Sequence, residues 1–167
     1  MVNKIFKLIL VLLLIITCIA CSEEQDDPCE GMESGKLPIM TFDDVFLSDS
    51  IDCWLKEGIG ELDIYGNLYF RIDNQVQFDA LVDCNCDLPN LNFDDYTLLM
   101  GKKRVNGDGT LELQTVYLNC EFPQIDYTLN ILVDTVGAVF SIFQYHAAIP
   151  KLPNGIEVDY SFSIHPK

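Results

Sequence analysis

Apolar and polar residues alternate along most of the chain after residue 66, in the pattern of strands that bury one face. The alternation is clearest at 156–165, and it recurs at 67–73 and at 127–134. Three more strands are predicted at 96–103, 110–120 and 139–149. The last of them is apolar on both faces for part of its length, so we expect it to be central.

A different spacing follows the strand at 67–73. Asn74 is a good N-cap residue, and Gln77 stands at the reciprocal position of a capping box. Phe78, Leu81 and Val82 then fall three and four residues apart, which places them on one helical face. The sequence therefore predicts one short helix with a single apolar stripe.

Turn signals separate the predicted strands. The segment 105–109 contains an Asn-Gly and an Asp-Gly pair, which favour a tight hairpin, and another Asn-Gly pair stands at 154–155. Weaker patterns suggest strands around 40–47 and 59–65. Strands joined in this way predict an α+β fold, namely a mostly antiparallel β-sheet meander with one short helix packed on it.

The N-terminal segment has the layout of a secretory signal. Lys4 and Lys7 precede an unbroken apolar run at 8–16. As a helix this run spans roughly 14 Å, which is too short for the roughly 30 Å core of a bilayer. We therefore expect residues 1–20 to be a cleaved signal peptide rather than a transmembrane anchor.

A cysteine directly follows the expected cleavage site. Ala20-Cys21 resembles a bacterial lipobox, in which a cysteine after a small residue receives lipid on its sulfur. Cys18 fits less well because the bulkier Thr17 precedes it. We expect Cys21 to carry a membrane-anchoring lipid, since several acyl chains together hold a protein stably on a bilayer. Cleavage after Ala20 without lipidation is the alternative.

Acidic residues dominate the rest of the chain. The formal net charge is −16, and loss of Lys4 and Lys7 with the signal makes it −18. Such a charge disfavours nucleic acid as a partner. Residues 21–36 are predicted to be an acidic flexible tether, followed by a single globular β-rich domain at 37–167. The start of the tether, 22–27, resembles the surface-export tags of one Gram-negative phylum. We expect the protein on the outer membrane, facing outward.

Five cysteines remain in the mature chain after Cys21. In an oxidising compartment they favour two disulfides and one unpaired thiol. Cys84 and Cys86 are too close in sequence to bond to each other comfortably, so we expect one of them to bond to Cys120 and the other to Cys53. Cys29 is the expected odd cysteine.

No motif in the sequence points to catalysis, a cofactor or a metal. A zinc site at Cys84 and Cys86 would lack the usual paired spacing. The segment 106–109 superficially matches a calcium loop but has Arg104 at the first ligand position. The mature chain has two histidines: His146 is expected to be structural, and His165 is close to the C-terminus. We therefore expect a non-enzymatic protein.

The segment 92–101 is the part of the chain that suggests a family. It reads NFDDYTLLMG, and it follows a short helix and a proline. This pattern is similar to the C-terminal domain of the accessory lipoprotein that stabilises the dentilisin-type protease complex, over roughly 69–164. Asn92 replaces the family's Asp, and 102–110 replaces its Gly-rich stretch. The resemblance implies a small α+β sheet and a supporting role in a protein complex.

Two functions follow from these patterns. The first is a non-catalytic, complex-stabilising or protein-binding accessory domain that engages an envelope or extracellular protein. The second is a glycan- or small-ligand-binding module of a nutrient-uptake system. For the second, the aromatic residues that could form a stacking platform are Trp54, Tyr65, Tyr69 and Tyr117.

Overall fold

The computed structural model describes residues 28–40, 53–84, 91–134 and 139–167. Most of these residues lie in strands, and one short helix follows the third strand. The elements are β1 (Gly35–Leu37), β2 (Cys53–Leu55), β3 (Asn67–Ile72), α3 (Gln75–Leu81), β4 (Val82–Cys84), β5 (Tyr96–Asn106), β6 (Asp108–Asn119), β7 (Gln124–Asp134), β8 (Phe140–Pro150) and β9 (Glu157–Pro166).

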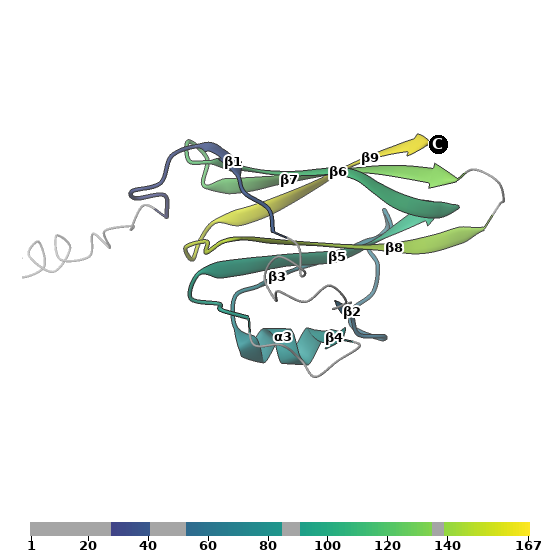
Figure 1. Cartoon of the computed structure of the whole chain (residues 1–167), viewed down its shortest axis with the longest axis horizontal. Coiled ribbons are helices and arrows are strands. Elements are labelled where there is room, and N and C mark those ends of the chain that lie inside the picture. Colours follow the sequence, from purple (N-terminus) through teal and green to yellow (C-terminus); the bar gives the residue numbers. More distant parts are fainter. Residues whose placement is uncertain (1–27, 41–52, 85–90, 135–138) are drawn as a thin grey trace, which may run out of the picture.

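The strands form two main sheets that pack face to face. Sheet A has the order β1-β6-β7-β9, and sheet B has the order β3-β5-β8. A small antiparallel ribbon, β2-β4, and the helix α3 lie on the other face of sheet B (Figure 1). Sheet B is therefore the middle layer of three.

The larger core lies between sheets A and B. On β7, Tyr127, Leu129, Ile131 and Val133 are all buried, as their shared face in the sequence predicted. They belong to the same cluster as apolar residues of sheet B such as Tyr145. Alternation with a period of two puts these residues on one side of the strand, and burial of that side holds the two sheets together.

A second core lies between sheet B and the outer layer. Leu98 and Ala148 pair across β5 and β8, and both are buried in one cluster with Phe78 of α3 and Leu55 of β2. Burial on both sides explains why the 139–149 run is apolar on both faces. The expectation that this strand is central is wrong within its sheet, because β8 lies at one end of sheet B.

The predicted helix forms where expected. The side chain of Asn74 accepts a hydrogen bond from the N–H of Gln77 at 2.9 Å, which is the N-cap interaction. The side chain of Gln77 accepts from the N–H of Asp73, one residue before the cap. The helix ends at Leu81, and the chain continues directly into β4.

The strands do not form the predicted meander. β5 lies in sheet B and β6 lies in sheet A, so 105–109 is a crossing between the two sheets and not a hairpin. Gly107 adopts a φ of 102°, and its N–H donates to the carbonyl of Val139 at 2.9 Å. β7 and β9 also pair in parallel, whereas the other strand pairs of the described residues are all antiparallel, as predicted. Alternation shows that a strand has a buried face, but it does not show which strand lies beside it.

The weak strand predicted at 59–65 is wrong as well. These residues form a loop that leads into β3. The carboxylate of Asp63 accepts hydrogen bonds from the N–H groups of Asn67 and Tyr65, both at 2.8 Å. These bonds, with the Asn67 N–H first, lower the pKa of Asp63. The strand predicted around 40–47 lies almost entirely outside the described residues.

The end of the predicted tether belongs to the folded part. Cys29 is buried and is bonded to Cys120, and β1 pairs with β6. The prediction of a flexible tether at 21–36 is therefore too long at its C-terminal end. An acidic composition predicted a solvated segment, but the disulfide and the β1 pairing hold it on sheet A.

Four tyrosines meet near the middle of the sandwich. Tyr127 donates to Gln114 at 2.7 Å, whereas the hydroxyls of Tyr145 and Tyr160 are buried without a hydrogen-bond partner among the described residues. Burial raises the pKa of Tyr145 and of Tyr160 well above that of a free tyrosine. Tyr69 stacks on Tyr160 with ring centroids 4.2 Å apart. These hydroxyls therefore stay protonated and act in packing.

The tyrosine hydroxyls predict opposite effects of two matched substitutions. Tyr160→Phe removes a buried hydroxyl without a partner, so we expect the free energy of unfolding to rise by about 1 kcal/mol. Tyr127→Phe leaves Gln114 without its donor, so we expect a fall of about 1 kcal/mol. Urea denaturation followed by circular dichroism measures both, and shifts of the same sign would contradict this assignment.

Candidate functional site

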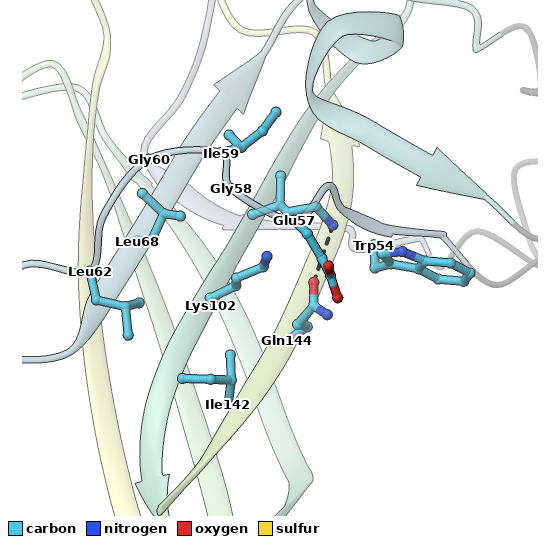
Figure 2. Close-up of a pocket in the computed structure, with 11 residues that line it drawn as sticks. Trp54, Glu57, Gly58, Ile59, Gly60, Leu62, Leu68, Lys102, Ile142 and Gln144 are labelled. Atoms are coloured by element: carbon cyan, nitrogen blue, oxygen red, sulfur yellow. Dashed lines mark hydrogen bonds between the residues drawn. The ribbon is translucent and has the colours of Figure 1, made fainter.

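A pocket of about 430 Å³ opens on the outer face of sheet B. Its apolar wall includes Ile59, Leu62, Leu68 and Ile142, contributed by the 56–62 loop, β3 and β8. Figure 2 shows these side chains around the space between that loop and the two strands β5 and β8. The volume lies within the range of small-molecule and peptide side-chain sites.

Three polar side chains complete the lining. Lys102 of β5 and Gln144 of β8 are directly opposite each other in the sheet, so both point to the outer face (Figure 2). Glu57, which is exposed, lies on the loop above them. The pocket therefore combines an aliphatic wall with an ammonium group, an amide and a carboxylate.

The β2-β4 ribbon closes one end of the pocket. Cys53 of β2 is paired with Cys84 of β4 and bonded to it, with a Cα–Cα distance of 4.1 Å. Two residues further along β2, Leu55 donates its N–H to Oε1 of Gln144 at 3.1 Å. Trp54 lies beyond Gln144, on the side of the pocket opposite Leu68 (Figure 2). The disulfide thus holds the ribbon that places Trp54.

Lys102 is the cation nearest the interior of the pocket. Its ammonium group donates to the main-chain oxygen of Lys56 at 3.3 Å, and no carboxylate lies within ion-pair distance in the described part of the chain. The ion pairs described there both involve Asp73, with Arg71 and Lys151. Lys102 therefore has charge available for a ligand.

The two histidines of the chain do not line the pocket. His165 is exposed near the C-terminus. His146 on β8 is paired with Met100 on β5, two positions along the sheet from the pair of Gln144 with Lys102. Within the described ranges, no group of three or more His, Cys, Asp or Glu residues could hold a metal ion.

The structure separates the aromatic residues that the sequence grouped as a platform. Trp54 lines the pocket, whereas Tyr69 stacks on Tyr160. Tyr65 is exposed on the loop before β3, and Tyr117 is exposed on β6 of sheet A. Trp54 is thus the platform candidate that reaches the pocket.

Sequence reasoning did not single out Lys102, Ile142 or Gln144. Each occupies an ordinary position on the partly solvated face of its strand, and no local sequence pattern marks it as a site residue. Only the pairing of β5 with β8 and the position of the 56–62 loop bring them together. The run of three cations at 102–104 in an acidic chain was the available signal.

The disulfides differ in part from the expected pairing. Cys53–Cys84 agrees with the weaker expectation, but Cys120 bonds to Cys29, which was expected to be unpaired. The two Cα atoms of this second bridge are 5.6 Å apart. The prediction failed because β1 returns the N-terminal segment to the end of β6, 91 residues later in the chain. Cys86 and the lipidation candidate Cys21 lie outside the described residues.

No protein-family model, curated protein or solved structure matches this chain. Among the described residues, no helix combines the length and the hydrophobicity needed to span a bilayer.

Proposed function

We propose that this chain is a non-catalytic lipoprotein, anchored in the outer membrane through Cys21, that binds an envelope or extracellular protein. The observation that carries the proposal is an exposed apolar end of sheet B. Phe140 and Ile142 on β8 are 71% and 48% exposed, and Ile142 also lines the pocket. Apolar side chains that continue from a pocket onto the surface favour a protein-binding face.

The position of this face suits a partner beyond the membrane. Cys29 is bonded to Cys120 at one end of β6, so Cys21 lies eight positions before the sandwich, at most about 29 Å of extended chain. Phe140 pairs with Asn106 at the opposite end of the sandwich (Figure 1). The length of β6, about 40 Å, then separates the exposed face from the anchored end.

The sequence resemblance supports the same role. The segment similar to the accessory lipoprotein of the dentilisin-type complex covers most of sheets A and B. That family's implied role is support of a protein complex. A binding face at the distal end of an anchored domain is suited to such a role.

Lipidation is tested by labelling cells with radioactive palmitate. We expect the wild-type chain and Cys18→Ala to incorporate label and to fractionate with the outer membrane. Cys21→Ala is expected to lose the label completely, because it lacks the thiol that accepts the lipid. Label on Cys21→Ala, or equal loss from both variants, would contradict the assignment of the anchor.

Protein binding at the exposed face is tested with a photo-reactive amino acid at two matched phenylalanine positions. Phe140 lies at the distal end, and Phe122, 65% exposed, lies on the turn between β6 and β7 at the anchored end. In intact cells we expect a discrete protein adduct from position 140 and none of that size from position 122. Adducts of equal yield from both positions, or none from position 140, would contradict the proposal.

A small ligand or glycan is the second candidate, and Trp54 at the pocket is the observation that favours it. An indole can stack on the apolar face of a sugar while Lys102 and Gln144 bind its hydroxyls.

Trp54 is the single tryptophan of the chain, so its fluorescence reports on the pocket directly. If this candidate is right, one oligosaccharide of a screened panel will shift the emission at micromolar to millimolar concentration. Lys102→Met is expected to weaken that response at least tenfold. An unchanged emission across the panel would remove this candidate.

A further inference from the structure

The edge strands of the two sheets differ in how they are protected. An edge strand presents unpaired N–H and C=O groups, and proteins usually protect such edges with charges, proline, bulges or covering loops. On β9, Glu157 and Asp159 are exposed, and the strand ends at Pro166. β1 pairs with only 116–118 of β6, and the part of β6 that β1 does not cover contains a bulge at 111–113.

In sheet B, the β3 edge is covered by a loop, whereas the β8 edge is covered at one position only. On β3, the guanidinium of Arg71 donates to the carbonyls of Leu152, Pro153 and Ile156, so the 152–156 loop covers that side. On β8, Met40 covers the edge at Ala148. Between Phe140 and Gln144 the strand reads FSIFQ, with neither a charge nor a proline. Among the described residues, none pairs with the edge of β8 at this end.

The backbone groups of this edge point outward at alternate residues. Ala148 exchanges both of its backbone hydrogen bonds with Met40, at 2.8 and 3.0 Å, so its N–H and C=O point away from β5. By the alternation of an antiparallel ladder, those of Phe140, Ile142 and Gln144 point the same way. None of these six groups has a backbone partner within the described ranges.

We propose that an extended segment of a partner protein adds to β8 beside Phe140–Gln144 as a further strand of sheet B, and places an apolar side chain in the pocket. This inference rests on the protein-binding function proposed above and specifies its mode. Ile142 and Gln144 both line the pocket, so residues of the added strand on the outer face lie next to its opening. Main-chain hydrogen bonds supply affinity in this mode, and the pocket supplies specificity.

Charge at the site specifies the segment further. Lys102 and Arg104 lie on the outer face of β5, opposite Gln144 and Ile142. An added strand would be two strands away, about 9.6 Å, which an acidic side chain and a lysine span together. Lys102 has no carboxylate partner in the described part of the chain, so it can attract an acidic side chain of the added strand. The exposed Glu57 would repel such a side chain near its own position at the pocket opening. We therefore expect an alternating segment with one apolar and one acidic residue on the pocket side.

The probe for this mode is a displayed library of random nine-residue peptides, screened against the full mature chain in detergent micelles. Enriched peptides are expected to alternate apolar and polar residues, to contain Asp or Glu two positions from the apolar residue, and to lack central proline. No enrichment, or enrichment of peptides without alternation, would overturn the proposal.

Two substitutions at one position then separate strand addition from simple apolar contact. Ile142→Ala and Ile142→Pro both shorten the side chain, but only proline removes the outward N–H, which faces solvent and not β5. We expect Ile142→Pro to bind the enriched peptide at least tenfold more weakly than Ile142→Ala. Equal affinities would overturn the proposal.

Hydrogen exchange in the wild-type chain gives a measurement that does not depend on folding of the proline variant. The enriched peptide is expected to slow exchange of the Ile142 and Gln144 amides at least tenfold, while the Phe143 amide, which faces β5, stays unchanged. Unchanged exchange at both outward amides would overturn strand addition. Failure of the crosslink from position 140 in cells, with these peptide results intact, would instead count against the proposed protein-binding function.

Discussion

Burial of sheet B on both faces is the constraint on which the rest of the structure depends. Residues of β5 point alternately into the core shared with sheet A and into the core shared with α3, so Leu99 and Leu98, next to each other in sequence, belong to different cores. Few polar positions are possible in such a strand. The outer layer, however, is shorter than β5 and β8. Beyond the end of the outer layer, the outer face of β5 changes from the buried Met100 to the charged Lys102, and the pocket opens there.

The two disulfides stabilise different layers of this arrangement. Cys53–Cys84 closes the small ribbon that covers sheet B and places Trp54, and Cys29–Cys120 fastens the N-terminal segment to sheet A. A ribbon of two three-residue strands buries little surface and would be marginal alone. The second bridge also fixes where the N-terminal segment joins the sandwich, because it holds Cys29 at the end opposite Phe140.

The buried tyrosines and the pocket lie in different parts of the fold. The strongly shifted pKa values belong to tyrosines packed between the sheets, and their cause is burial. The pocket instead combines an aliphatic wall with an ammonium group that has no carboxylate partner among the described residues, and it lies beside an edge strand of sheet B. These features suit recognition of an extended, partly acidic segment, and the anchor proposed at Cys21 would present them away from the membrane.

Local spacing determined much of the secondary structure. The alternation at 127–134 and 156–165 marks the strands β7 and β9, and Asn74 with Gln77 marks the start of α3, because side-chain direction and capping depend on residues a few positions apart. Signals of the same kind at the N-terminus led to the predictions for Cys21.

Tertiary structure alone decided which strands are neighbours. The Asn-Gly pair at 106–107 suits a hairpin and a crossing between sheets equally well, and only the burial of β5 on both faces distinguishes the two. The bond of Cys29 to Cys120 and the meeting of Lys102 with Gln144 are likewise contacts between residues far apart in sequence. Such contacts depend on how whole sheets stack, and hydrophobic packing of sheets is set by the sum of many side chains and not by any local motif.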